Sequence, residues 1–555
     1  MNGSLLLITS GLFLLLSYAI YGRYLAKVFE VNDSAPTPAH TQTDGIDYVP
    51  TASPVLFGHH FASIAGAGPI VGPVLGAVFG WVPVAIWIIL GCALIGAVHD
   101  FSSLIISIRH EGRSIGHILE GYLSYSGRQM FLLFSTAALI LVIAIFALLI
   151  AQTFITNPAV ASASVMFMAL ALVFGLMERQ KILSLEVRSA IFVPLMFAAI
   201  YAGIALPLDW VALLGISAEG SRLLWIGFLF IYIFIASVAP VWILLQPRDY
   251  LNSFLLYAML ILAAASIFVT APAIQLPAFS GFVVAEPTKG LTNWSLFPIL
   301  YVTIACGACS GFHALVSSGT TAKQLNRESH ALPIGYGAML LEGILAIIAL
   351  ISVAILNRGE FLQTLSAEGP VSAFSKGIAS LSVHLGLPIT SGQTFISLTI
   401  SAFLLTTLDT ATRLTRFTVQ ELAIPRIGSN KQKNVLQKVL SNRYLATVLV
   451  LSLAGYLTVS GDAGRIWPVF GASNQLLAAL TLLGITVILI HKRKNFWVTF
   501  IPFVFMMVIS GWALIELLIE NIKNANWLLA GSSIFLLAMS LALAANACQK
   551  IRKAF

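Results

Sequence analysis

The strongest candidates for chemistry in this sequence are ionisable side chains inside long apolar stretches. Glu342 stands in Gly-Ala-Met-Leu-Leu-Glu-Gly-Ile-Leu at residues 337–345. A charged group at such a position is costly to bury in lipid and commonly serves a function. Because a carboxyl group binds and releases a proton as its surroundings change, Glu342 is a candidate proton carrier. The alternative is a carboxylate that only bonds to a neighbouring helix.

Two pairs, His59-His60 and His99-Asp100, stand in consecutive apolar stretches that would run antiparallel and could bring the pairs together. Imidazole and carboxylate groups suit zinc or iron, so His59, His60, His99 and Asp100 are candidate ligands of a transition metal. Adjacent helical residues point about 100° apart, so spacing also leaves a proton relay or a hydrogen-bonded gate open.

A third group combines a carboxylate with hydroxyl groups. Asp409 follows Thr406 and Thr407 in a stretch rich in serine and threonine. Hydroxyls and freed backbone carbonyls can coordinate Na⁺, whereas Asp409 by itself is expected to cap the next helix or to pair with Arg413. The candidate ion-coupling residues are Glu342, Asp100, Thr406, Thr407 and Asp409.

Two apolar stretches, 57–79 and 295–318, carry glycine and proline where a simple anchor would carry leucine. These residues predict a helix broken near mid-membrane, whose freed backbone groups can bind a substrate. Close packing of small residues is the alternative. The candidate substrate-binding residues are Gly66, Ala67, Gly68, Pro69, Gly307, Ser310, Gly311 and His313, with Asn474 and Gln475 in a later stretch.

These residues are exceptions in an apolar chain. Of 555 residues, 58% are hydrophobic and 9% are charged, and the mean hydropathy is +0.93. Soluble domains carry about 25% charged residues, so the composition excludes a cytosolic enzyme, a disordered protein and a disulfide scaffold. With 30 basic and 22 acidic residues, no nucleic-acid partner is expected. The expected surroundings are a lipid bilayer.

Apolar runs of about 20 residues, each long enough to cross the hydrocarbon core, recur down the chain. They predict an all-α polytopic membrane protein with about 15 transmembrane helices. The predicted spans are 4–22, 57–79, 82–108, 128–152, 159–177, 187–206, 223–245, 250–270, 295–318, 332–356, 389–409, 444–459, 467–490, 496–518 and 527–547.

The two interrupted stretches are the second and ninth spans, so they cross in opposite directions, and each opens a block of five helices. This pattern is typical of inverted-repeat transporters of the leucine-transporter type. The predicted divisions are an extra helix and loop at 1–56, a first repeat at 57–206, two inserted helices at 207–293, a second repeat at 294–490 and two extra helices at 491–555.

Basic residues predict an N-terminus outside and a C-terminus inside, because Lys and Arg are retained on the cytoplasmic side. The net charge of +8 is then an orientation signal, with anionic headgroups as its partner. Residues 411–424 are expected to form a helix at the cytoplasmic surface, and residues 369–386 a short cap outside.

No enzymatic activity is expected, because the sequence has neither a phosphate-cradling Gly-Lys-Thr loop nor a nucleophile motif. Cys306 and Cys309 have the spacing of a redox pair but stand in a glycine-rich membrane helix, which favours packing. The sequence indicates no certain cofactor beyond a coupling ion, H⁺ or Na⁺, with a transition metal left open, and no particular oligomeric state.

Six short motifs together resemble the carbon starvation protein A (CstA) family, and the likeness runs from about residue 4 to about residue 490. The resemblance implies uptake of peptides, or of pyruvate in a proton-coupled branch, across the bacterial inner membrane under nutrient limitation. It also implies a relationship to the APC superfamily of inverted-repeat transporters. The motifs are Phe-Gly-His-His-Phe-Ala-Ser-Ile-Ala-Gly-Ala-Gly-Pro-Ile from Phe57, Gly-Ala-Val-His-Asp-Phe from Gly96, Ile-Ala-Cys-Gly-Ala-Cys-Ser-Gly-Phe-His from Ile304, Ser-Ser-Gly-Thr-Thr from Ser317, Thr-Thr-Leu-Asp-Thr-Ala-Thr-Arg from Thr406 and Phe-Gly-Ala-Ser-Asn-Gln-Leu from Phe470.

Three functions therefore compete. The first is a secondary active transporter that imports small carboxylate-bearing nutrients, peptides above all, during carbon starvation, driven by H⁺ or Na⁺. The second is a proton-coupled pyruvate symporter, for which a single cationic anchor would suffice, whereas a peptide or amino-acid site should also offer a carboxylate to the α-amino group. Glu342 could supply that carboxylate if it faces the cavity. The third is a metal-binding membrane redox or sensor protein built on the histidines.

Overall fold

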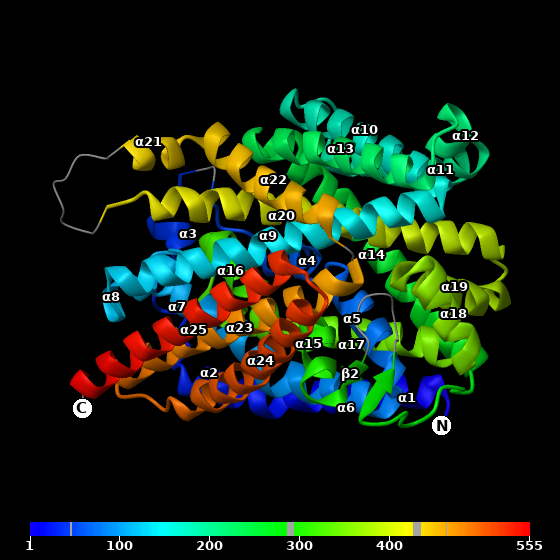
Figure 1. Cartoon of the computed structure of the whole chain (residues 1–555). Helices are drawn as coiled ribbons and strands as arrows, with labels where there is room; N and C mark the ends of the chain where they lie inside the picture. The colour runs from blue at the N-terminus through cyan, green and yellow to red at the C-terminus, as the bar shows by residue number, and fades with distance from the viewer. Residues whose placement is uncertain (45–46, 286–292, 426–434, 462, 555) are drawn as a thin grey trace.

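The chain folds almost entirely into helices (Figure 1). The computed structural model describes residues 1–44, 47–285, 293–425, 435–461 and 463–554. Within these ranges 14 helices are long and apolar enough to cross a membrane. A further pair, Ser53–Ile64 and Gly68–Phe79, passes the same test together and bends by 46° at its break. Counted as one broken span, the pair brings the total to 15, as the sequence predicts.

Most spans are single helices, and a few are assembled from two helical pieces. In chain order they are α1 (Gly3–Ser17) with α2 (Arg23–Val28), α4 (Ser53–Ile64) with α5 (Gly68–Gly76), α6 (Trp81–Gly91) with α7 (Ala97–Ile108), α9 (Tyr125–Thr156), α10 (Pro158–Arg179), α11 (Leu185–Ala205), α13 (Ala218–Val238), α14 (Val241–Thr270), α15 (Tyr301–Ile304) with α16 (Phe312–Gly319), α17 (Ala338–Ala354), α20 (Ile389–Leu422), α22 (Arg443–Ser460), α23 (Ala463–His491), α24 (Trp497–Lys523) and α25 (Trp527–Ala554). Between them lie α3 (Pro38–Thr41), α8 (Ile115–Tyr122), α12 (Trp210–Leu214), α18 (Arg358–Glu368), α19 (Pro370–Ser382), α21 (Val435–Ser441) and the antiparallel strands β1 (Val283–Ala285) and β2 (Asn293–Ser295).

The second and ninth spans are both broken, as glycine and proline predict. In the second span α4 ends at Ile64 and α5 restarts at Gly68, with Pro69 in its first turn, where the missing N–H of proline costs no hydrogen bond. In the ninth span α15 ends before Ala305, whose φ is +35°, and α16 begins only at Phe312.

The two broken spans run antiparallel, with their interrupted regions against each other. Gly72 on α5 packs on Ile304, and Gly76, one turn further along, packs on Leu300. Residue numbers therefore rise along one span as they fall along the other, as in antiparallel helices. A Cβ atom on Gly72 would lie 2.5 Å from the carbonyl oxygen of Ile304, so this approach requires glycine. The opposed directions are those of an inverted repeat.

Two predicted boundaries are wrong. The chain turns between α13 and α14 at Ala239-Pro240, upstream of the predicted gap at 246–249, because proline interrupts the ladder of α13 and begins α14. The predicted surface helix 411–424 is the last part of α20, which continues unbroken to Leu422. Arg413 and Arg416 in this part donate to backbone carbonyls at the end of α13, so protein contacts replace the membrane surface.

The predicted outer cap at residues 369–386 contains a helix, α19, with a buried apolar face. Val371, Phe374 and Ile378 on α19 are all buried. Covered in this way, α19 belongs to the packed body of the protein.

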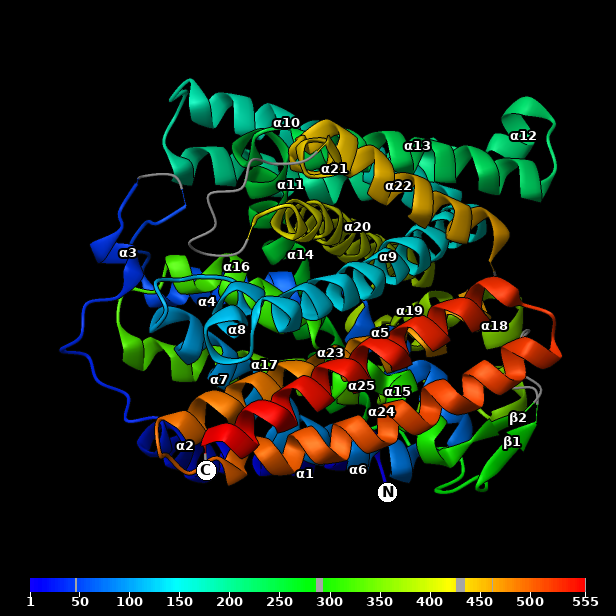
Figure 2. The same cartoon turned by 60° about the vertical axis from the view of Figure 1, so that its left-hand side comes forward.

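The broken spans occupy the middle of the molecule. Figures 1 and 2 both show α10, α11 and α13 at one side and α1, α6 and α24 at the opposite side, with α4, α5, α15 and α16 between them. A broken helix in this position has protein on its sides, which is the condition under which irregular backbone survives at membrane depth.

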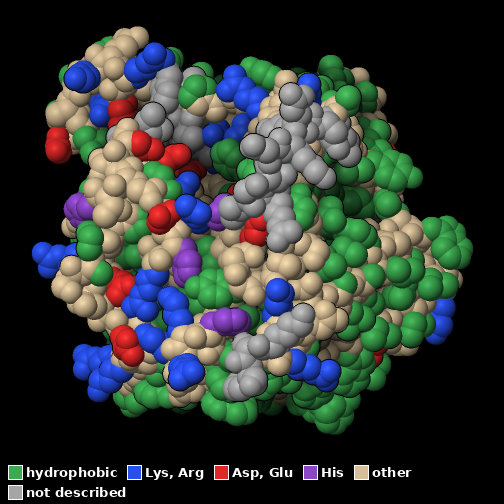
Figure 3. Space-filling model, turned by 90° about the vertical axis from the view of Figure 1, so that its left-hand side faces the viewer, with side chains coloured by type: hydrophobic (Ala, Val, Ile, Leu, Met, Phe, Trp, Pro, Cys, Tyr) green, Lys and Arg blue, Asp and Glu red, His purple; other side chains and the backbone are tan. Residues whose placement is uncertain are grey.

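Basic side chains gather at one end of the molecule, the end at which α3, α8 and α21 lie (Figure 3). Ion pairs tie neighbouring spans together there: Arg109 Nε lies 2.6 Å from Glu328 Oε1, and Lys494 Nζ lies 2.7 Å from Glu30 Oε2. Because basic residues are retained on the inner side of a membrane, this arrangement favours the predicted orientation, with this end toward the cytoplasm.

Candidate functional site

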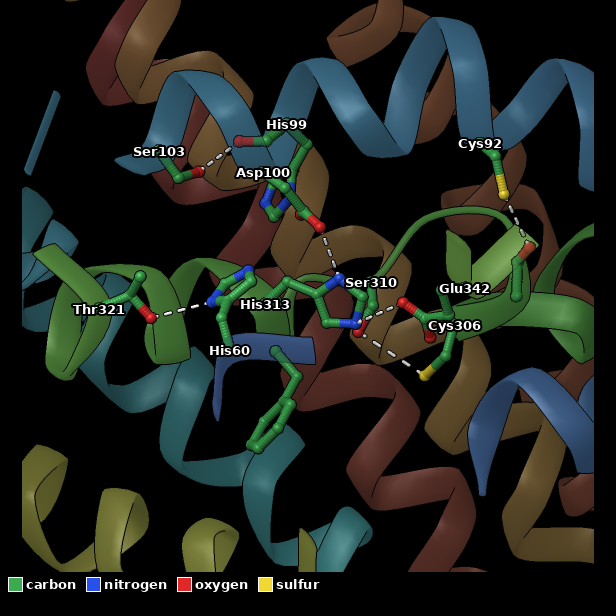
Figure 4. Close-up of polar contacts among 12 residues, drawn as sticks. His60, Cys92, His99, Asp100, Ser103, Cys306, Ser310, His313, Thr321 and Glu342 are labelled. Atoms are coloured by element: carbon green, nitrogen blue, oxygen red, sulfur yellow. Dashed lines mark hydrogen bonds and ion pairs between the residues drawn. The ribbon is translucent and has the colours of Figure 1, made fainter. Parts of the chain in front are cut away.

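Ionisable side chains from three spans form a continuous buried chain (Figure 4). On α7, Asp100 places Oδ2 2.7 Å from Nδ1 of His313 on α16, and Oδ1 2.7 Å from Nδ1 of its neighbour His99. On the other side of the imidazole, His313 Nε2 lies 3.5 Å from Glu342 Oε2 on α17. The fold thus brings two predicted ion-coupling residues, Asp100 and Glu342, to the same histidine, which was predicted to bind substrate.

The two contacts of His313 differ in kind. The contact with Asp100 has the length of a strong hydrogen bond, whereas 3.5 Å to Glu342 exceeds it. Neither carboxyl oxygen of Glu342 has a hydrogen-bond partner among the described residues, and the side chain is 0% exposed. An unpaired buried charge is costly. A proton on Glu342 would remove that charge, and a protonated His313 would compensate it, so either change would stabilise this contact. The arrangement suits a group that gains and loses a proton.

Asn474 on α23 closes the N-terminus of α16. Its side-chain carbonyl accepts the backbone N–H of Phe312 at 3.0 Å, and its backbone carbonyl accepts that of Gly311 at 3.1 Å. Its side-chain amide donates to Ser310 Oγ at 3.0 Å. The amides that the sequence offers to an anionic substrate are therefore occupied by Asn474 in this conformation.

Two other predicted substrate-binding residues are also engaged within the protein. Gln475 donates from its side chain to the carbonyl of Tyr301 at 2.8 Å. The carbonyl of Gly307 accepts the thiol of Cys92 at 3.0 Å. Both contacts hold the irregular part of the ninth span against its neighbours.

The break of the second span, residues 65–69, is fully buried. Gly66 faces α20, where an added Cβ atom would lie 2.5 Å from Thr407 Oγ1, and Gly68 faces Cys306. The Thr407 hydroxyl has no hydrogen-bond partner among the described residues. Ala67 and Pro69 are buried beside these glycines. The structure therefore places Thr407 at the break, as a Na⁺ site between the second span and α20 would require.

Asp409 does not pair with Arg413, contrary to the expectation from sequence. It forms a buried ion pair with Arg248 on α14 and accepts from Tyr232 Oη on α13 at 2.8 Å, and Arg248 also donates to Tyr232. Arg413 instead donates to two backbone carbonyls at the end of α13, at 2.6 and 2.8 Å. Because α20 continues past Asp409, the carboxylate caps no helix and joins three spans.

The four predicted metal ligands do not form one ligand group. His60 Nδ1 lies 2.9 Å from Thr321 Oγ1, His59 lines a cavity, and His99 bonds to Asp100. Over the described ranges, no group of three or more His, Cys, Asp or Glu side chains is placed to hold a metal ion.

A cavity of about 1790 Å³ enters the protein from the basic end. It reaches Ser63, three residues before Gly66, and its mouth includes Asp47 and Tyr48 of the loop before α4. Of the predicted site residues only His59 lines it. Its charged and histidine lining residues are Asp47, His59, Arg113, His117, Asp249, Lys323, Arg413, Arg416, Glu421 and Arg443.

The opposite side of the break is tightly packed. A Cβ atom on Gly471 of α23 would lie 1.9 Å from the carbonyl oxygen of Val302, and the indole of Trp467 donates to the carbonyl of Thr303 at 3.0 Å. The cavity therefore approaches the break of the second span from one side of the membrane and ends at Ser63, three residues before Gly66. Access from one side is typical of one state of an alternating-access protein.

Opposed broken spans beside a one-sided cavity are typical of a multi-pass membrane transporter. The sequence profile of the family described as "Carbon starvation protein CstA" matches residues 2–369 and 362–513, and the chain belongs to this family. The "Peptide transporter CstA" of Campylobacter jejuni is 34% identical over 89% of this chain and 77% of its own, and that of Bacillus subtilis is 33% identical over 92% and 90%. The "Pyruvate/proton symporter BtsT" of Escherichia coli is 33% identical over 90% and 79%.

Among solved structures, MhsT in complex with L-phenylalanine aligns with 90% of this chain and 98% of its own, at 13% identity and a TM-score of 0.44. That score is too low to establish a shared fold. The inverted arrangement rests on the packing of the two broken spans described above.

Sequence reasoning missed Arg248, Asp249 and Asn252, all on α14. The predicted gap between spans put Arg248 and Asp249 in a loop, whereas α14 begins earlier and carries both into the protein. Asn252, one turn on, donates to Thr406 Oγ1 at 2.7 Å. The available signal was the one-turn spacing of a charged pair and an amide directly before an apolar run, which favours one buried helix face.

Proposed function

We propose that this protein imports small carboxylate-bearing nutrients, peptides first among them, across the bacterial inner membrane and couples their uptake to H⁺. The supporting observation is the buried chain of Asp100, His313 and Glu342. It joins α16, the second half of a broken span, to α7 and α17. A proton gained or lost by these three residues changes the strength of the contacts that attach α16 to α7 and α17. Coupling requires that the proton stabilise one conformation of the protein more than another.

The coupling proceeds by exchange of contacts at His313. With a proton on Glu342, the imidazole is held chiefly by Asp100. Loss of that proton leaves a buried carboxylate that must be compensated, and a protonated His313 between two carboxylates supplies the charge. The contact between α16 and α17 therefore differs between protonated and deprotonated Glu342. The hydrogen bond between the imidazole and Asp100 of α7 is kept in both states.

The charges in the cavity support peptides over pyruvate. Glu342 is buried and does not line the cavity, so it is not the carboxylate that meets an α-amino group. Asp249 is a lining carboxylate, and Lys323 and Arg413 are lining cations. A zwitterion matches both signs, whereas pyruvate needs only a cation.

Coupling to Na⁺ is the second candidate, and one observation favours it. Thr407 directs an unpartnered hydroxyl toward Gly66 at the break of the second span. Oxygen ligands at such a break are typical of Na⁺-coupled transporters. The two ions are distinguished by which gradient drives uptake.

Proteoliposomes that contain the purified full chain test the proposal. Labelled L-alanyl-L-alanine, L-alanine and pyruvate are offered in counterflow, and then in uptake driven separately by a pH gradient and by a Na⁺ gradient. We expect counterflow of the dipeptide and accumulation driven by the pH gradient. Accumulation that follows only the Na⁺ gradient would identify Na⁺ instead of H⁺ as the coupling ion. An absence of counterflow with every substrate would refute the proposal.

A further inference from the structure

Behind the cavity wall lies a cluster of charges that joins three spans. Arg248 of α14 is 0% exposed and pairs with Asp409 of α20, and Tyr232 of α13 bonds to both. The same guanidinium lies 3.3 Å from the next residue, Asp249, measured from Nη2 to Oδ1. One cation is therefore shared by two carboxylates.

The two carboxylates differ in exposure. The Asp409 side chain is 0% exposed, whereas Asp249 keeps 10% of its side-chain surface exposed and lines the cavity. With all three groups ionised, the cluster carries one negative charge in excess, located on the side of Asp249. Buried charges are normally compensated by a partner, so this excess favours a cation in the cavity beside Asp249.

The two arginines of this wall on α20 are engaged away from Asp249. Arg413 and Arg416 line the same cavity from α20, but both guanidinium groups donate to the carbonyls that end α13. His59 lines the cavity from α4, close enough to interact electrostatically with Asp249, and Thr406 of α20 forms a side-chain hydrogen bond with Asp249. Among the described residues, Arg248 is the one ion-pair partner of Asp249, and it is already engaged by Asp409.

Asp249 lines the same cavity as Ser63, which stands three residues before Gly66 at the break of the second span. Asp249 stands about two turns inside the start of α14. On α20, Arg413 lies one turn nearer the mouth than Asp409, the partner of Arg248. Asp249, next to the partner of Asp409, thus lies further from the cytoplasmic end than Arg413. This order suits a substrate whose ammonium group enters first.

We propose that Asp249 receives the α-ammonium group of the substrate, with Arg248, Asp409 and Tyr232 positioning its carboxylate. The inference rests on the proposed transport function and deepens it. It makes the substrate class peptides or amino acids with a free amino group and excludes pyruvate as the preferred ligand. Asp249 is the binding residue, and the three residues behind it act through Asp249.

Competition in counterflow tests this assignment. Labelled L-alanyl-L-alanine is exchanged by reconstituted full-length protein in the presence of unlabelled L-alanyl-L-alanine, its N-acetyl derivative or pyruvate. N-acetylation removes the positive charge and keeps the carboxylate. We expect the acetylated dipeptide to compete at least about tenfold more weakly, because it brings no positive charge to the excess negative charge at Asp249.

Variants of Asp249 test whether this side chain distinguishes the free dipeptide from the acetylated one. In Asp249→Asn the ratio between free and acetylated dipeptide should fall to near one, and Asp249→Glu should restore part of it. Asp47→Asn is the matched control, because it removes the same charge at the mouth of the same cavity, and it should keep the wild-type ratio.

Each outcome decides the matter. Equal competition by the two dipeptides in the wild type overturns the assignment even if no variant folds, and so does an unchanged ratio in Asp249→Asn. Exchange of pyruvate without exchange of any dipeptide overturns it as well and leaves transport intact. If no compound is exchanged, the proposed function itself fails.

Discussion

His313 Nδ1 lies 2.7 Å from Asp100 Oδ2, so an imidazole in the second half of a broken span is held by a carboxylate 213 residues earlier in the chain. The other oxygen of Asp100 is taken by His99, which sets the carboxylate in place. The remaining nitrogen of His313 faces Glu342. One side of the imidazole is thus firmly bonded, and the other is free to respond to a proton.

Glu342→Gln should separate transport from its driving force. The amide keeps the size of the side chain but cannot carry a proton, so we expect the pH gradient to drive no accumulation above the external concentration. Counterflow, which needs no net proton movement, should persist. Both are measured with labelled dipeptide in proteoliposomes.

Glu360→Gln is the control for this variant, because Glu360 is an exposed carboxylate on α18. It should behave as the wild type in both assays. Normal pH-driven accumulation by Glu342→Gln would remove Glu342 from the coupling path.

Asp409→Asn should destabilise the fold strongly. The substitution removes the fully buried carboxylate that pairs with Arg248 and leaves this guanidinium with Asp249, 3.3 Å away at the edge of the cavity. Breaking a buried ion pair costs up to about 3–5 kcal/mol. The replacement of all three charged members by uncharged residues, Arg248→Met with Asp409→Leu and Asp249→Asn, should cost less than the single change, because no unpaired charge remains. Equilibrium unfolding in detergent measures both.

A double-mutant cycle identifies the partner of Asp409. We expect a coupling energy between positions 409 and 248 and almost none between 409 and 413, because Arg413 bonds to the end of α13. Coupling to position 413 alone would restore the pairing that the sequence suggests.

Gly72→Ala should loosen the packing of the two broken spans. The added methyl group would lie 2.5 Å from the carbonyl oxygen of Ile304, and overpacking of this kind costs about 1–3 kcal/mol. Gly511→Ala on α24 is the matched control, because a Cβ atom there meets nothing within 4 Å and the change should alter stability by under about 1 kcal/mol. Equal effects of the two substitutions would contradict this account.

The anchoring of the cytoplasmic loop before α4 should depend on pH through Asp33. Partial burial by itself raises the pKa of this carboxyl, but hydrogen bonds from the Ser329 side chain and backbone, with the nearby Arg327 and His330, lower the pKa overall. A carboxyl group whose pKa is lower in the folded state stabilises it above the unfolded pKa. This contribution is lost as the pH falls through the folded pKa.

Asp33→Asn therefore should lower the melting temperature at pH 7, with the difference from wild type shrinking as the pH falls below about 4. Tryptophan fluorescence during heating measures both proteins over a pH series. A difference that stays constant across the series would show that the carboxylate charge does not contribute.

Local patterns sufficed for the helices but not for every boundary. The apolar runs predict each span because a bilayer requires about 20 apolar residues wherever the chain crosses. The turn after α13 was misplaced because Pro240 ends one helix inside a run that stays apolar, and α20 was cut short at Asp409 because a charge looks like the end of a span. Arg248, near the first boundary, pairs with Asp409, and Arg413 and Arg416, near the second, donate to carbonyls of α13. No local pattern in the sequence reveals these partners.

By itself the sequence determined the membrane class, the number of spans and the two breaks, because each follows from local composition and from the chemistry of lipid. Only the tertiary structure decided that Asp100 holds His313, that Asp409 chooses Arg248 over Arg413, and that Asn474 fills the N-terminus of α16. These contacts depend on how helices are rotated and packed against one another, and residues far apart in the chain meet only when that packing is complete.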